Sequence, residues 1–124
     1  MKRFFLTFLL LISFPVIASH IVGGEFELIH ISGDTYRLNL ILYFDQINGL
    51  PGAKDQSISA TIYRKKDIVP MGTVVLPRIS EANVPYTQPE CSNGELITSK
   101  LIYTTTLKLS PEIYNDPQGY FVVW

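Results

Sequence analysis

The chain has 124 residues, with ten basic residues against eleven acidic ones and a formal net charge of −1. This length is enough for one domain. The sequence has no basic stripe and no aromatic platform with interleaved Lys or Arg, so it offers nothing that would favour a nucleic-acid partner.

The first residues predict a secretory signal peptide rather than part of the fold. A short basic start, Met1-Lys2-Arg3, precedes an apolar run from Phe4 to Ile17, and small or β-branched residues of Val16-Ile17-Ala18 stand before the expected cut. The alternative is a membrane anchor, but the run is short for a span of roughly 20 residues and Pro15 interrupts it. We therefore expect a signal peptide at 1–18, a β-domain at 19–124, export to the cell surface or the medium, and no membrane span after cleavage.

A hairpin is the clearest element of the mature chain. Two β-rich runs, Glu25 to Ile31 and Tyr36 to Asp45, flank a turn that contains Gly33 and Asp34. One face of the second run is wholly apolar and is expected to face the core. The residues of that face are Tyr36, Leu38, Leu40, Leu42 and Phe44.

Four more strands are predicted after the hairpin. They are Ser57 to Arg64, Thr73 to Leu76, Lys100 to Leu109 and Gly119 to Trp124. Pro77 is expected to end the second of these because proline cannot donate to a ladder, and Arg78 to Ser99 is expected to be the longest irregular segment. Six short strands with turns between them predict an all-β, immunoglobulin-like antiparallel β-sandwich.

The last predicted strand is the most apolar one and reaches Trp124. Immunoglobulin-like sandwiches typically have seven strands, so we expect the last strand to be missing and the domain to be truncated at its C-terminal side. Tyr120 follows the stretch Asp116 to Gly119 and has two interpretations. It is either a tyrosine corner, whose hydroxyl bonds back to the backbone, or a plain core tyrosine.

No catalytic, cofactor-binding or metal site can be assigned, and we expect a protein that is not an enzyme. His20, His30 and Cys91 are too few for a zinc site. His30 is expected to be packed or exposed at a rim. Asp45 and Asn48 lie in or beside one loop with Asp55, but their spacing matches no calcium motif, so a turn with side-chain hydrogen bonds is favoured.

Two tyrosines and one cysteine are the candidates for binding or pairing. Tyr43 and Tyr63 lie on the outward faces of their strands, where they could bind a surface glycan or a protein partner, or could be ordinary surface tyrosines. Cys91 is the single cysteine. It is a free thiol, an intermolecular bridge, or half of a disulfide whose partner is missing.

Several stretches of the sequence also resemble a known family. They are Ser19 to Glu25 (SHIVGGE), Tyr36 to Tyr43, Asn48-Gly49, Val75-Leu76-Pro77, Cys91 and Gly119 to Trp124. Together they resemble the N-terminal region of large secreted surface proteins of Bacteroidetes, of the gliding-motility-associated or type IX secretion sorting-domain type. The chain departs from that pattern at Asp45-Gln46, where relatives often have an aspartate and a cysteine.

The resemblance implies a longer protein, with a cysteine pair soon after the last motif that could supply a partner for Cys91. It implies no catalytic residues. We therefore expect a non-enzymatic exported structural or adhesion module of a cell-surface or secreted protein. Two alternatives remain open at this point: a fragment of a secreted hydrolase, and a pilin-like subunit whose incomplete sandwich accepts a donor strand.

Overall fold

The computed structural model describes residues 21–124, apart from the side chain of Cys91, and the predicted signal peptide at 1–18 lies outside this range. The predicted all-β fold is confirmed. The strands are β1 (Ile21–Ser32), β2 (Thr35–Asp45), β3 (Ser57–Arg64), β4 (Val69–Asn83), β5 (Thr98–Lys108) and β6 (Tyr120–Val123). Two short 3₁₀ helices, η1 (Pro51–Ala53) and η2 (Pro89–Cys91), lie in connections. Within the described range, none of the helical segments has the length and apolar character needed to cross a membrane.

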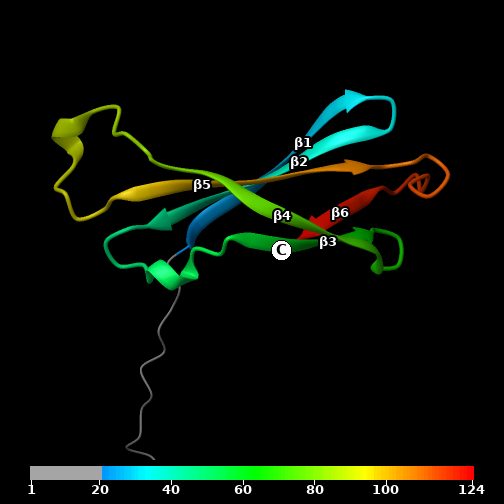
Figure 1. Cartoon of the computed structure of the whole chain (residues 1–124), viewed down its shortest axis with the longest axis horizontal. Helices are drawn as coiled ribbons and strands as arrows, with labels where there is room; N and C mark the ends of the chain where they lie inside the picture. Colours follow the sequence, from blue (N-terminus) through cyan, green and yellow to red (C-terminus); the bar gives the residue numbers. More distant parts are fainter. Residues whose placement is uncertain (1–20) are drawn as a thin grey trace, which may run out of the picture.

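The strands form one curled antiparallel sheet in the order β1-β2-β5-β4-β3-β6 (Figure 1). The long strand β4 belongs to both halves of this sheet. Its first part pairs with β3, and from Arg78 to Asn83 it pairs with β5. The register shifts between Arg78 and Ser80. Because β4 carries the sheet round a bend, the two halves form two sandwich-like layers that are joined rather than separate.

The β1–β2 hairpin forms as predicted. Its turn residues are Gly33 and Asp34, and Gly33 has a φ of 55°, a left-handed conformation that glycine adopts without steric cost. The predicted inward face of β2 is buried except for Tyr36, which is half-buried, and Ile41 and Asp45 on the other face are buried as well. The sequence pattern of this strand therefore sets which face meets the core.

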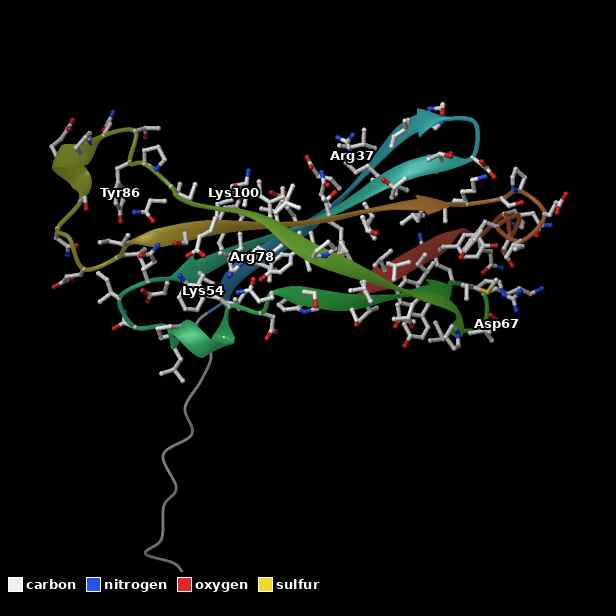
Figure 2. All side chains as sticks on the ribbon, viewed as in Figure 1. Arg37, Lys54, Asp67, Arg78, Tyr86 and Lys100 are labelled. Atoms are coloured by element: carbon white, nitrogen blue, oxygen red, sulfur yellow. The ribbon has the colours of Figure 1, made fainter. Side chains whose placement is uncertain are left out.

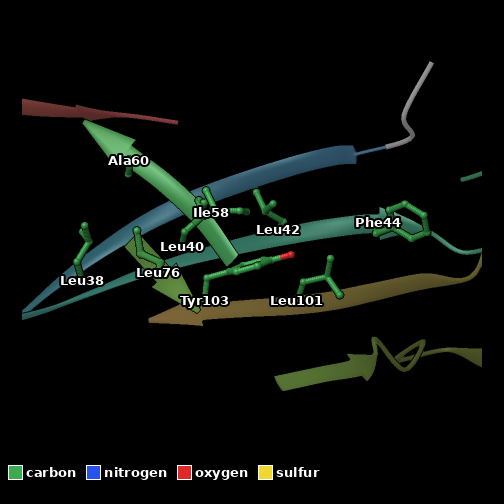
Figure 3. Close-up of a cluster of buried hydrophobic side chains, with 9 residues drawn as sticks. All are labelled: Leu38, Leu40, Leu42, Phe44, Ile58, Ala60, Leu76, Leu101 and Tyr103. Atoms are coloured by element: carbon green, nitrogen blue, oxygen red, sulfur yellow. The ribbon is translucent and has the colours of Figure 1, made fainter. Parts of the chain in front are cut away.

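The core lies between the two layers (Figure 3). Its buried members come from four strands and are Leu38, Leu40, Leu42, Phe44, Ile58, Ala60, Leu76, Leu101 and Tyr103. Each buried Leu or Ile contributes about 1.5–3 kcal/mol relative to an exposed position. These contacts hold the β2–β5 layer against the β3–β4 layer.

Strand β4 corrects the sequence prediction. Thr73 to Leu76 was expected to be a short strand ended by Pro77, and that prediction is wrong because β4 runs from Val69 to Asn83. The Arg78 N–H donates to the Gln56 carbonyl at 2.8 Å, so the Pro77 nitrogen faces the other side of the strand, where the pairing with β5 has not begun. No ladder hydrogen bond is lost there, and the irregular segment shrinks to 84–97.

Tyr120 ties the β5–β6 connection together. Its hydroxyl donates to the Ile113 carbonyl at 3.3 Å and accepts from the Asp116 N–H at 3.0 Å. The Tyr114 ring packs edge-on against the Tyr120 ring, with the two ring centroids 5.1 Å apart. The hydroxyl bonds back to the backbone, which favours the tyrosine-corner interpretation over a plain core tyrosine.

Candidate functional site

An apolar groove with a volume of about 500 Å³ lies between the two layers of the described residues. It lies at the end of the molecule where β2 begins and β5 ends, beside the start of β6. Phe26 and Leu28 of β1 line one wall, and Phe121 and Val122 of β6 line the other. Leu109 lies in the wall contributed by the β5–β6 connection.

Two sheet edges flank this groove. Among the described strands, β1 and β6 are the two ends of the sheet, and each pairs with one neighbour only. Alternate backbone N–H and C=O groups of an edge strand point away from its neighbour and can pair with another extended chain. The groove therefore combines an apolar floor with edge backbone that can make hydrogen bonds.

The groove lining carries no ionisable group except tyrosine hydroxyls. His30, on the same face of β1, is exposed beside the turn, as the rim interpretation expected. Its Nε2 lies 2.9 Å from the Gly33 carbonyl oxygen, and its ring centroid lies 5.1 Å from that of Tyr36. This lining suits the binding of apolar side chains.

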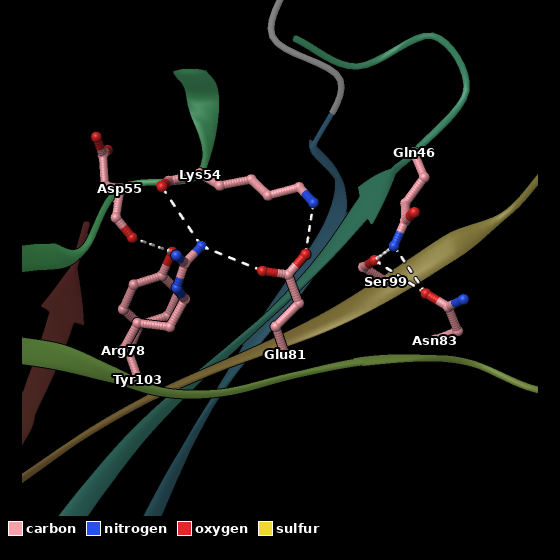
Figure 4. Close-up of polar contacts among 8 residues, drawn as sticks. All are labelled: Gln46, Lys54, Asp55, Arg78, Glu81, Asn83, Ser99 and Tyr103. Atoms are coloured by element: carbon pink, nitrogen blue, oxygen red, sulfur yellow. Dashed lines mark hydrogen bonds and ion pairs between the residues drawn. The ribbon is translucent and has the colours of Figure 1, made fainter. Parts of the chain in front are cut away.

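The opposite end of the curled sheet is covered by the segment 46–56 (Figure 4). Lys54 Nζ pairs with Glu81 Oε1 at 2.5 Å and lies 4.8 Å from the centre of the Phe44 ring. The Tyr103 hydroxyl donates to the Asp55 carbonyl at 2.9 Å. Burial raises the pKa of this hydroxyl, and the nearby Arg78 guanidinium opposes part of that rise. Figure 2 shows Lys54 and Arg78 side by side over this end.

A second polar cluster lies at this end. Gln46 Nε2 donates to Ser99 Oγ, and to Asn83 Oδ1 at 2.7 Å. Ser99 is fully buried in β5, so its hydroxyl needs these partners. The cluster ties the end of β2 to β4 and β5.

The predicted turn with side-chain hydrogen bonds is confirmed at Asp45 and Asn48. Asp45 Oδ1 accepts from the N–H groups of Ile47 and Asn48 at 2.9 and 3.1 Å, and Oδ2 accepts from Asn48 Nδ2 at 2.8 Å. The described part of the chain has no set of three or more His, Cys, Asp or Glu side chains placed to hold a metal ion.

The two candidate tyrosines do not form one site. Tyr43 lies on the outer face of the β1–β2–β5 layer, where its hydroxyl donates to Glu25 Oε1 at 3.3 Å. Partial burial is the largest cause that raises the pKa of the Tyr43 hydroxyl, and the negative charge of Glu25 raises it further. Tyr63 lies on the outer face of the other layer, and its ring stacks on Phe121 with centroids 5.4 Å apart and planes 17° apart.

Cys91 lies at the end of η2, in the connection between β4 and β5. The three predicted states of Cys91, a free thiol, an intermolecular bridge or half of a disulfide, stay predictions.

The comparisons with known proteins leave the function open. No protein-family model matches the chain, and neither the curated proteins nor the solved structures contain a significant match. The functional argument therefore depends on the geometry of the chain itself.

The sequence predicted that most of the groove residues lie in strands, but it did not predict the groove itself. Phe26 and Leu28 were placed in the first predicted strand, Glu25 to Ile31, and Phe121 was placed in the last one, Gly119 to Trp124. Nothing local indicates that these strands enclose a space. The only signal in the sequence was the expectation of an unpaired edge beside the last strand.

Proposed function

We propose that this chain is a non-enzymatic, exported structural module whose groove accepts an extended peptide strand. The observation that supports the proposal most is the apolar groove between the edge strands β1 and β6. An added strand can pair its backbone with an edge and place alternate side chains in the space beneath, which is the recognition mode called β-augmentation. The predicted signal peptide and the resemblance to Bacteroidetes surface proteins support a place at the cell surface.

A bound strand would use two features of the groove: its backbone would pair with an edge strand, and its apolar side chains would fill the groove. The backbone of β6 between Tyr120 and Val123 is the edge nearest the groove floor. Every second residue of a strand points to the same face, so an alternating apolar sequence would fill the groove with half of its side chains. The other half would face solvent and would be polar. A sequence of this kind is the ligand that we propose.

A binding assay with synthetic peptides tests this function. Trp124 is the single tryptophan and directly follows β6 with 52% of its surface exposed, so its fluorescence reports on the β6 edge. We expect an alternating apolar peptide of strand length to shift the Trp124 emission to the blue and to bind with a saturable curve. A control peptide with proline at alternate positions should not bind, because proline removes the backbone donors.

A pair of variants locates the binding. Leu28 lines the groove and is 53% exposed, whereas Ile29 lies on the other face of β1 and is 42% exposed. Leu28→Ser should weaken peptide binding about tenfold, because a buried apolar side chain is worth at least about 1.5 kcal/mol. Ile29→Ser should leave it unchanged. Equal effects of the two variants, or tight binding of a small apolar dye with no peptide binding, would remove the strand-accepting function.

A second candidate function is adhesion through the outer face of β3 and β6. The stacked pair Tyr63 and Phe121 favours it, because two parallel rings beside Thr61 form a flat amphipathic surface of a kind that can bind a glycan. Tyr63→Ser should then reduce glycan or surface binding. Tyr43→Ser, on the opposite face, is the matched control, and equal binding by both variants and the unchanged chain would remove this candidate.

A further inference from the structure

The chain contains two Asn-Gly pairs in connections, and they differ in how they are held. Asn48-Gly49 follows β2, and Asn93-Gly94 follows η2. In an Asn-Gly pair the glycine backbone nitrogen can attack the asparagine side-chain carbonyl carbon, because glycine has no side chain to hinder the approach. Ammonia leaves as a cyclic succinimide forms, and water then opens the ring to aspartate or isoaspartate. The reaction needs water as its only co-reactant.

Asn48-Gly49 is locked at both reacting groups. The Gly49 N–H, which must act as the nucleophile, donates to the Asp45 carbonyl at 2.9 Å. The Asn48 side-chain amide, which must be attacked, donates to the Asp45 carboxylate at 2.8 Å. Asp45 is only 6% exposed. A Cβ added at Gly49 would lie 2.2 Å from the Asp45 carbonyl oxygen, so Asp45 packs closely against Gly49.

Asn93-Gly94 is held only by hydrogen bonds to exposed neighbours, without a buried partner like Asp45. Both residues are exposed, and no atom lies within 4 Å of the place where a Gly94 Cβ would stand. The Gly94 N–H contacts the Ser92 hydroxyl at the long distance of 3.3 Å. The Asn93 amide bonds to the exposed Glu95, as donor to Oε2 at 2.7 Å and as acceptor from the backbone N–H at 3.1 Å. Exposed bonds of this kind open easily.

We propose that Asn93 is a site of spontaneous, non-enzymatic deamidation in the folded protein and that Asp45 protects Asn48 from the same reaction. The product has consequences for the connection between β4 and β5. A new carboxylate at position 93 cannot donate to the Glu95 carboxylate and repels it, so the turn loses its side-chain bond. This inference is independent of the groove and of the proposed function.

The test is to age the folded chain at mildly alkaline pH and to follow both sites by peptide mapping and mass spectrometry. We expect aspartate and isoaspartate to form at position 93 at least about tenfold faster than at position 48, because the partner of Asn48 is the buried Asp45 carboxylate, whereas the partners of Asn93 are exposed to water. The same chain in denaturant should lose the difference, because both pairs are then unstructured. This comparison needs no variant.

Two variants sharpen the test. Asn93→Gln should abolish the fast product without altering the slow site, because a longer side chain closes the ring less readily. Asp45→Ala should raise the rate at Asn48 toward that at Asn93. Equal rates in the folded chain, or an intact Asn93 in the folded chain together with rapid reaction in denaturant, would overturn the proposal.

Discussion

The same strands run through both ends of the curled sheet, but different connecting segments lie at the two ends. At the filled end, the segment 46–56 lies over the core, with Lys54 above Phe44 and the Asp55 carbonyl bonded to Tyr103. At the open end, the connection 109–119 leaves the groove uncovered, although Tyr120 ties that connection together. Phe44 is 1% exposed, whereas Phe26 near the other end is only half-buried.

This difference shows that connections, rather than strands, decide which part of the core is closed. Strand β2 contributes an unbroken apolar face to both ends. The filled end gains ion pairs, buried hydroxyl bonds and a turn organised by Asp45. The open end lacks such a cover among the described residues, and its two edge strands border the space. Stability should therefore concentrate at the filled end and binding at the open end.

The largest expected effect comes from truncating one aromatic residue at each end. Phe44→Ala should destabilise the mature chain by about 3–5 kcal/mol, because it removes a fully buried ring and leaves a cavity beneath Lys54. Phe26→Ala should cost less than half as much, because its ring already borders the open groove. Denaturant unfolding of the two variants measures both. Equal losses would contradict the division into a filled and an open end.

The next effect concerns the tight cover of the filled end. Gly49→Ala should destabilise by about 1–3 kcal/mol, because the added Cβ would lie 2.2 Å from the Asp45 carbonyl oxygen and 2.3 Å from the Phe44 ring. Gly23→Ala is the matched control, since its Cβ would meet only the Tyr43 ring at 4.0 Å. Thermal unfolding should separate the two variants clearly. A neutral Gly49→Ala would show that the segment 46–56 packs loosely.

A smaller effect, of opposite sign, is expected at the open end. Ile68, in the β3–β4 turn, has a φ of 59°, a left-handed conformation that disfavours a β-branched residue. Ile68→Asn should stabilise the chain by about 1 kcal/mol, because asparagine tolerates this conformation. Ile68 is 60% exposed, so little burial is lost. Ile68→Val keeps the branching and should give no gain. A gain from both variants would show that strain is not the cause.

The strands were predictable where local pattern alone decides the structure. The alternation of Leu38, Leu40 and Leu42 gave the buried face of β2, and β3 has the predicted bounds Ser57–Arg64. Strand β4 was not predictable in full. Whether Pro77 ends a strand depends on which neighbour its nitrogen faces, and that is fixed by pairing with β3 and β5, which are far away in the sequence.

The candidate site was less predictable than the fold for the same reason. Tyr43 and Tyr63 were chosen by their outward faces, and the structure places them on opposite layers. The groove depends on how far apart the curled sheet leaves Phe26 and Val122, which no local pattern encodes. The polar cover at Gln46 and Ser99 likewise requires the ends of two strands to meet. Tertiary arrangement, rather than local propensity, creates both features.

Hydrogen exchange of the backbone amides, with and without an alternating apolar peptide, tests the central claim most directly. Without peptide, the amides of β2 and β5 should exchange slowly and those of β6 faster, because edge strands open at lower free energy. With peptide, exchange should slow in β6 and in the facing part of β1, and should stay unchanged at the filled end. Uniform slowing over the whole sheet, or none in β6, would contradict the claim that the open end accepts a strand.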